Sequence, residues 1–117
     1  MTYNNETYLY FAENLGGDAA GDSAVWPASN FLGIDPTTAT TTRISFKAMD
    51  GEGHDDIVDV THVSGMYKQL CEALAICLNS TKPGLVVFMD EDNTIYHETL
   101  RERGVIDGST QLNISLG

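Results

Sequence analysis

The chain has 117 residues, of which 17 are acidic and six are basic, so its formal net charge is −11. That length predicts a single domain, residues 1–117, with its own core. The negative charge repels phosphate backbones and argues against nucleic-acid binding. Hydrophobic residues make up 42% of the chain, which is enough to bury a core and argues against disorder.

The hydrophobic residues are scattered along the chain. No run approaches the ~20 apolar residues of a membrane span, and residues 1–6 lack the basic and then apolar layout of a signal peptide. We therefore expect no membrane contact and no Sec-type export. Cys71 and Cys77 fall on one predicted helix, separated by about 9 Å of rise. They cannot pair with each other, so we expect two free thiols.

The first third of the chain predicts one strand and a short edge segment. Residues 7–13 are dense in aromatic side chains and are typical of a strand. The glycine-rich residues 14–23 predict a loop. Residues 24–33 are apolar again, but Pro27 limits them to a short strand or turn at a sheet edge. We expect Trp26 to anchor this segment to the core.

The clearest alternation follows the threonine-rich turn at residues 35–42. Residues 43–48 alternate between apolar and polar side chains, which predicts a half-buried strand. The acidic residues 50–56 then form a predicted hairpin loop. That loop leads back into a strand at residues 57–60.

Residues 64–79 carry a helical pattern. Apolar side chains recur every three or four residues at Val63, Met66, Tyr67, Leu70, Leu74 and Cys77. After Glu72 the sequence is apolar all round, so we expect the second half of the helix to be covered on more than one side. Pro83 and Gly84 end the segment, and the wholly apolar residues 85–89 predict a short strand.

The remaining chain predicts short elements. Residues 90–93 form a polar turn, and with a strand at residues 94–97 they predict a hairpin. Residues 98–103 fit a helical turn, and residues 111–116 alternate as a strand. The predicted fold is therefore α+β, a mainly antiparallel β-sheet with one long helix (about 64–79) packed on it.

Catalytic and transition-metal motifs are weak. Gly21-Asp22-Ser23 resembles the nucleophile block of the GDS-type esterases, but the domain is too short for their α/β architecture. A surface turn explains it better. The spacings of His54, His62 and His97 fit no zinc pattern. We expect no catalytic residue, no cofactor and no enzymatic activity.

Two acidic loops offer oxygen atoms that suit a hard cation such as Ca²⁺. One loop gathers Asp50, Glu52, His54, Asp55 and Asp56, and the other Asp90, Glu91 and Asp92. Neither matches an EF-hand, and charged turns are common without metal. A calcium-dependent role for these loops stays open as an alternative.

The aromatic cluster near the N-terminus is the stronger signal for function. It consists of Tyr3, Tyr8, Tyr10 and Phe11. Tyrosine is favoured at protein interfaces because it offers a large area with a polar tip. The alternative is that these are ordinary sheet residues.

Several stretches together resemble a small virion-protein family from tailed phages of marine cyanobacteria and related hosts. They are Tyr10-Phe11-Ala12-Glu13, then the stretch from Trp26 to Gly33 with the threonine run to Thr42, then Asp59-Val60-Thr61-His62. Their order covers most of residues 8–79, and the C-terminal third matches less distinctly. The resemblance implies a structural protein without catalytic residues, made in the host cytoplasm and carried on the capsid surface of the virion.

We therefore predict a capsid decoration or cement protein that binds the major capsid protein and contacts sister copies. The predicted interface residues are Tyr3, Tyr8, Tyr10, Phe11, Trp26, Phe31 and Leu32. The alternative is a small host-attachment or carbohydrate-binding module that uses the acidic loops with calcium.

Overall fold

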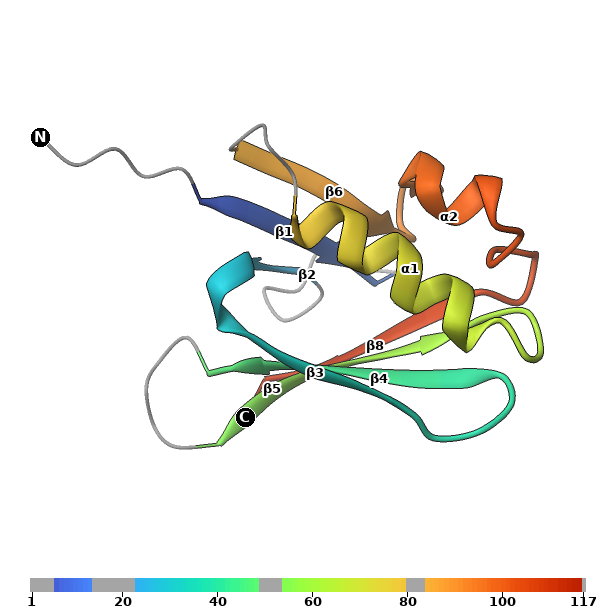
Figure 1. The fold of residues 1–117 in the computed structure, drawn as a ribbon, viewed down its shortest axis with the longest axis horizontal. Helices are drawn as coiled ribbons and strands as arrows, with labels where there is room; N and C mark the ends of the chain where they lie inside the picture. The colour runs from blue at the N-terminus through green and yellow to red at the C-terminus, as the bar shows by residue number, and fades with distance from the viewer. Residues whose placement is uncertain (1–5, 14–22, 49–53, 80–83, 117) are drawn as a thin grey trace, which may run out of the picture.

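The computed structural model describes residues 6–13, 23–48, 54–79 and 84–116, which form two four-stranded β-sheets and two α-helices (Figure 1). We call the sheets A and B. The predicted α+β class is confirmed. The prediction of one sheet is corrected to two sheets.

Sheet A has the strand order β2-β1-β6-β7. Its strands are β1 (Thr7–Ala12), β2 (Ser23–Pro27), β6 (Gly84–Asp90) and β7 (Ile95–Tyr96). β1 pairs antiparallel with β2 but parallel with β6, and β6 and β7 form the predicted hairpin. The β1–β6 pair is thus a parallel exception to the predicted antiparallel pairing. Parallel neighbours need a long connection, and here everything from β2 to α1 lies between them.

Sheet B is antiparallel throughout, in the order β3-β4-β5-β8. Its strands are β3 (Phe31–Pro36), β4 (Thr41–Lys47), β5 (Asp55–Thr61) and β8 (Gln111–Ser115). The alternation predicted for residues 43–48 is confirmed. Ile44 and Phe46 are fully buried, whereas Arg43 and Lys47 are exposed.

The segment predicted as one short element at residues 24–33 is divided between the two sheets. β2 ends at Pro27, a 3-10 turn covers Ala28–Asn30, and β3 begins at Phe31. Both strands lie at sheet edges, as predicted. Proline has no N–H to extend a ladder, so the chain leaves sheet A here and crosses to sheet B.

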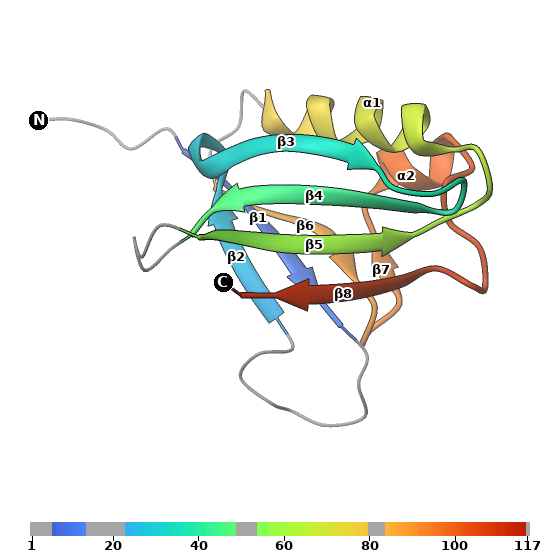
Figure 2. The same cartoon turned by 90° about the horizontal axis from the view of Figure 1, so that it is seen from below.

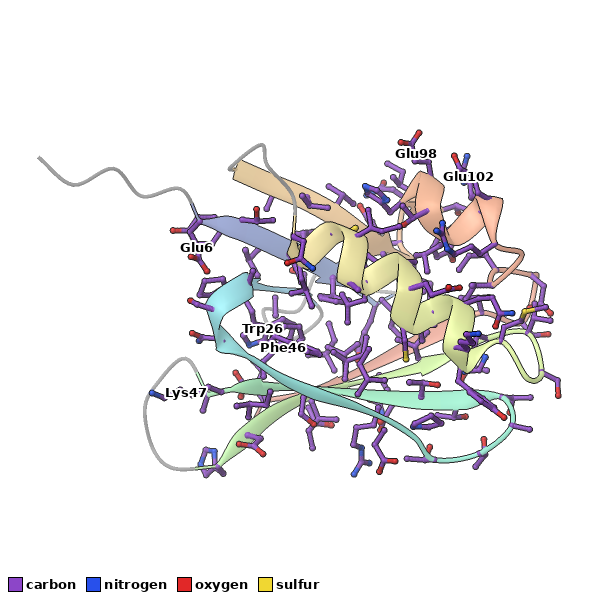
Figure 3. The ribbon with its side chains drawn as sticks, in the orientation of Figure 1. Glu6, Trp26, Phe46, Lys47, Glu98 and Glu102 are labelled. Atoms are coloured by element: carbon purple, nitrogen blue, oxygen red, sulfur yellow. The ribbon has the colours of Figure 1, made fainter. Side chains whose placement is uncertain are left out.

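The inner faces of the sheets meet in an aromatic core. The rings of Trp26 and Phe46 stack with their centroids 4.6 Å apart. Phe11 meets Trp26 at 5.7 Å and Phe88 at 5.6 Å, both edge to face. Figure 3 shows Trp26 and Phe46 between the sheets. The prediction that Trp26 anchors its segment to the core is confirmed.

The helix predicted at residues 64–79 is shorter than expected, because α1 covers Tyr67–Leu78, 12 residues. Gly65 has a φ of 77°, outside the helical region, and its N–H donates to the Ala39 carbonyl at 2.7 Å. This contact holds the preceding turn out of the helix. At the other end, the Asn79 side chain donates to the Ala75 carbonyl at 2.9 Å.

α1 presents one buried stripe to the space between the sheets, made of Leu70, Ala73, Leu74 and Cys77. Ile76 is 48% exposed, so the expectation that the second half of the helix is covered on several sides is wrong. The predicted helical turn at residues 98–103 is confirmed as α2 (Glu98–Glu102). Its Leu100 is fully buried in the core.

Three carboxylates tie sheet A to sheet B. Asp56 on β5 accepts a hydrogen bond from Trp26 Nε1 on β2 at 2.9 Å. Glu13, just after β1, accepts from the Ile114 amide, and Glu91, just after β6, accepts from the Leu112 amide at 2.9 Å. Both amides belong to β8, which is an edge strand of sheet B. The carboxylates therefore take the place of a missing neighbour strand.

Candidate interaction face

Six uncharged side chains share the outer face of sheet A, the side turned away from sheet B. They are Tyr8 and Tyr10 on β1, Val25 and Pro27 on β2, and Leu85 and Val87 on β6, which we call the tyrosine face. Side chains alternate along a strand and paired residues share a side. The register pairs Tyr8 with Pro27 and Leu85, and Tyr10 with Val25 and Val87.

The tyrosine face is open to solvent. Leu85 is 61% exposed and the other five members are partly exposed. None of the six belongs to the core cluster, whereas Val86, the residue between Leu85 and Val87, packs against it. The outer face of a solvated sheet usually carries polar side chains. The tyrosine face carries aromatic and aliphatic side chains instead.

Among the described residues, one carboxylate stands at each end of the tyrosine face, and both are engaged. Glu6 precedes β1 and accepts a hydrogen bond from the Ser29 amide at 2.7 Å. That bond lowers the pKa of Glu6. Asp90, at the end of β6, accepts from the Asn93 side chain at 2.9 Å. The face therefore has an apolar centre and a polar rim, the usual anatomy of a protein interface.

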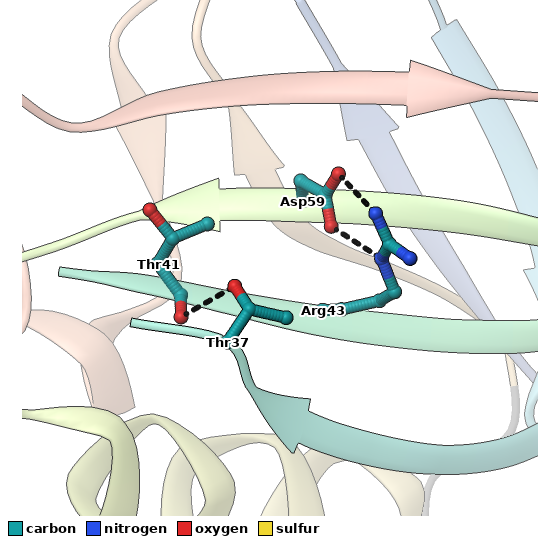
Figure 4. Close-up of polar contacts among 4 residues, drawn as sticks. All are labelled: Thr37, Thr41, Arg43 and Asp59. Carbon is teal, nitrogen blue, oxygen red and sulfur yellow. Dashed lines mark hydrogen bonds and ion pairs between the residues drawn. The ribbon is translucent and has the colours of Figure 1, made fainter. Parts of the chain in front are cut away.

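The outer face of sheet B shows the opposite pattern. Arg43 on β4 binds Asp59 on β5 through two hydrogen bonds of 2.9 and 3.2 Å (Figure 4). This contact raises the pKa of Arg43. In the loop that leads into β4, the Thr37 hydroxyl donates to the Thr41 carbonyl at 3.2 Å. Charge and hydroxyl groups make this side a solvated surface.

The seven predicted interface residues separate into four groups. Tyr8 and Tyr10 lie on the tyrosine face, and Tyr3 lies outside the described residues. Phe11 and Trp26 are fully buried in the core, so the expectation that they contact a partner is corrected. Each points inward because it lies one position away from an outward-facing residue of its strand.

Phe31 and Leu32 belong to β3 in sheet B, away from the tyrosine face. Phe31 packs against the core and meets Phe46 edge to face, with centroids 6.0 Å apart. Leu32 is 55% exposed. Among these two, only the Leu32 side chain is largely available to a partner.

Four members of the tyrosine face were not predicted. Val25, Pro27, Leu85 and Val87 join the two tyrosines through strand pairing. The apolar run of β6 does not reveal in the sequence which side chains face solvent, and Leu85 is exposed. A strand buried on both faces and a strand with one exposed apolar face have the same sequence pattern. In β6 the inward-facing Val86 and the outward-facing Val87 are both apolar, so the sequence does not distinguish the two cases.

Three described carboxylates of the acidic loops are engaged in structural hydrogen bonds. Asp90 binds Asn93, Glu91 binds the Leu112 amide, and Asp56 binds Trp26. Residues 50–53 of the first loop lie outside the described residues. Within the ranges that the structure describes, no three acidic, histidine or cysteine side chains gather as metal ligands.

Two histidines have local structural partners. The Nδ1 atom of His62 lies 2.8 Å from the Val63 carbonyl, which can only accept, so Nδ1 carries the hydrogen. Its Nε2 atom then accepts from the Thr42 hydroxyl at 2.8 Å. His97 caps α2, where Nδ1 accepts from the Thr99 amide at 3.3 Å.

Of the residues that resemble an esterase nucleophile block, the structure describes Ser23 alone. Gly21 and Asp22 lie outside the described residues, and Ser23 is the exposed first residue of β2. Asp59 and His62 have the Asp-x-x-His spacing of such enzymes. However, Asp59 binds Arg43 on the outer face of sheet B, while both nitrogens of the buried His62 are occupied.

An open polar hollow of about 600 Å³ lies beside β7 and α2. Its lining includes Tyr96, Arg101 and Gln111. Burial raises the pKa of the Tyr96 phenol, and the nearby Glu91 and Asp90 charges add to the shift. These groups supply an aromatic surface and hydrogen-bonding side chains.

Neither a membrane-spanning helix nor a match to a known protein guides the assignment of function. No helix in the described ranges is long and apolar enough to cross a membrane. The chain matches no protein-family model, no curated protein and no solved structure. The features that bear on function are therefore the tyrosine face and the sequence resemblance.

Proposed function

We propose that this chain is a non-enzymatic structural protein of a phage virion. In this proposal it is a decoration or cement protein that binds the outer surface of the shell formed by the major capsid protein. The contact is the tyrosine face. The observation that carries the proposal is an uncharged, solvent-exposed sheet face on a chain with a net charge of −11.

The size of the tyrosine face fits a contact repeated many times over a shell. Three strands spaced ~4.8 Å apart and about 17 Å long span roughly 250 Å². A standard-size stable interface buries about 800 Å² on each partner. One copy therefore binds weakly through this face alone. Many copies on one shell each add a modest contact, and sister copies that touch one another strengthen the whole.

The proposal is tested by co-sedimentation with phage heads that lack this protein. Wild-type protein is expected to bind these heads saturably. It should not co-sediment with heads that already carry a full set of copies. The double variant Tyr8→Thr/Tyr10→Thr should bind at least about tenfold more weakly, because two aromatic anchors are lost. Threonine keeps the β propensity of the strand.

Ile57→Thr is the matched control. Ile57 lies on the outer face of β5 in sheet B, is partly exposed and pairs with Ser45 and Ser115. Its replacement also exchanges a large side chain for threonine on a sheet, so head binding should stay at the wild-type level. Failure of the wild-type protein to bind bare heads would refute the proposal.

The second candidate is a host-attachment or carbohydrate-binding module, and the polar hollow beside Tyr96 favours it. An aromatic ring with nearby hydrogen-bonding side chains such as Arg101 and Gln111 suits a hydroxyl-rich ligand. Binding on a glycan array that EDTA abolishes would support the calcium-dependent form. Binding that survives EDTA would show that the glycan binds without Ca²⁺.

A further inference from the structure

We propose that two copies of this chain pair through the outer edge of β2, which no other described strand pairs with, so that their A sheets join into one continuous sheet. The partner is a second copy, antiparallel to the first across a two-fold axis at Val25. The pairing is testable without phage heads. Only the purpose assigned to it, an enlarged tyrosine face, rests on the proposed function.

The two sheets have four edge strands, and two of them are closed or very short. At β8, Glu13 and Glu91 accept hydrogen bonds from the amides of Ile114 and Leu112. Strand β7 has two residues and leads directly into α2. Neither edge offers a row of free backbone groups to another strand.

The other two edges differ in regularity. β3 has a register shift between Phe31 and Gly33, and it ends at Pro36. β2 pairs with β1 at all five of its residues without a shift. A regular strand is the better template for an added strand, so β2 is the edge that the geometry favours.

The direction of the β2 backbone follows from its proline. A proline in an edge strand points its nitrogen toward solvent, because it has no N–H to give to the ladder. Backbone direction alternates along a strand. The N–H and carbonyl groups of Val25 and Ser23 therefore face the same open edge as Pro27.

A two-fold axis at Val25 satisfies these groups. The two Val25 residues exchange two N–H to carbonyl bonds, the pattern of a hydrogen-bonded antiparallel pair. Each Ser23 amide then donates to the Pro27 carbonyl of the other copy. Proline supplies no donor in return, so the seam holds four backbone hydrogen bonds.

Charge does not oppose this seam. Ser23, Val25 and Pro27 are all uncharged, although 20% of the chain is charged. Two copies with a net charge of −11 each repel one another at long range. Salt screens that repulsion over about 8–10 Å, and the seam residues that the structure describes carry no charge.

Pairing through β2 also enlarges the apolar surface. Val25 and Pro27 lie on the tyrosine face, so the seam places two tyrosine faces side by side. The combined face is roughly 500 Å² by the same strand spacing. That is close to the ~600 Å² per partner at the lower end of stable interfaces. The dimer would therefore bind the shell more tightly than a single copy.

The first test is sedimentation equilibrium of wild type, Val25→Pro and Val25→Thr. Wild type should dimerise reversibly at concentrations up to about 0.5 mM. Proline removes the two Val25 donors and should weaken the dimer about 30-fold. Threonine keeps the N–H and should stay within about threefold of wild type. A thermal melt by circular dichroism checks that both variants fold.

The second test traps the seam with a disulfide. In the proposed pair the two Val25 Cα atoms lie about 5.5 Å apart, within reach of a disulfide. Val25→Cys should therefore give a covalent dimer on mild oxidation. Leu85→Cys, on the same face but two strands from the edge, should not.

The outcomes separate this proposal from the proposed function. A wild-type chain that stays monomeric, together with an untrapped Val25→Cys variant, would overturn the β2 pairing even if the protein binds heads. A dimer that Val25→Pro dissolves would establish the pairing even if head binding fails. Equal dimerisation of Val25→Pro and wild type would assign the dimer to another surface.

Discussion

At the scale of single residues, position within a strand decides what an aromatic side chain does. Tyr8 and Phe11 lie on the same strand, yet one faces solvent and the other fills the core. Trp26 combines both kinds of stabilisation. It stacks on Phe46, and its indole N–H reaches the buried Asp56 carboxylate. A buried polar atom with a partner costs little to bury.

The two cysteines carry a prediction about reactivity. Burial raises the pKa of the Cys77 thiol, and a hydrogen bond from Thr99 offsets this shift only in part. Burial also raises the pKa of Cys71, which is less enclosed. A raised pKa lowers the fraction of reactive thiolate at a given pH.

Iodoacetamide at pH 8 should therefore label Cys71 slowly and Cys77 more slowly still in the folded protein. Mass spectrometry of the alkylated peptides measures both rates. In urea the two rates should become similar. Labelling of Cys77 as fast as Cys71 in the native state would contradict the buried position of Cys77 in α1.

At the scale of elements, α1 supplies the core through one narrow stripe. Leu74 is fully buried, whereas Ile76, two residues further on, is 48% exposed. Leu74→Asp should abolish folding, because it removes about 2–5 kcal/mol of packing and buries a charge. Ile76→Asp should fold with a nearly unchanged melt. Circular dichroism compares the two, and a folded Leu74→Asp variant would place the core elsewhere.

The capped edge of β8 is the second element with a measurable contribution. Glu13→Ala removes the acceptor of a buried amide and should lower the free energy of unfolding by about 1–3 kcal/mol. Glu91→Ala should act in the same direction. Glu98→Ala and Glu102→Ala remove the same charge from the exposed surface of α2 (Figure 3), and each should change stability by less than about 0.5 kcal/mol.

Urea denaturation measures all four variants. If the Glu13 and Glu91 variants are as stable as the α2 controls, the two carboxylates do not stabilise the β8 edge. Glu13→Gln is informative as well, because its amide oxygen can still accept the hydrogen bond. It should retain most of the stability that Glu13→Ala loses.

The strands could be predicted because their periodicity is local, whereas the helix start and the sheet partition could not. Residues 43–48 and 111–115 alternate in the sequence and in the structure, whereas Leu116, the next apolar residue of the pattern, is 48% exposed. The helix begins late because Gly65 binds Ala39, a contact with the β3–β4 turn. No local pattern reveals such a partner. The split at Pro27 likewise depends on which sheet each strand joins.

At the scale of the whole molecule, the outer faces of the two sheets differ in charge. In Figure 2 the strands of sheet B lie in front of sheet A, and their outer side carries the Arg43–Asp59 pair. The opposite side carries the tyrosine face. Tyr8 and Tyr10 could be chosen as candidate contact residues from their type, and both lie on this face. Leu85 and Val87 could not, because only the parallel pairing of β6 with β1 brings them there.

The most direct measurement is hydroxyl-radical footprinting of the protein, free and bound to bare phage heads. Oxidation at Tyr8, Tyr10 and Leu85 should fall on binding, because the tyrosine face becomes covered. Tyr67 on α1 is 41% exposed and should keep its rate. Protection at Tyr67 with unchanged oxidation at Tyr8 and Tyr10 would contradict the assignment of the tyrosine face as the contact surface.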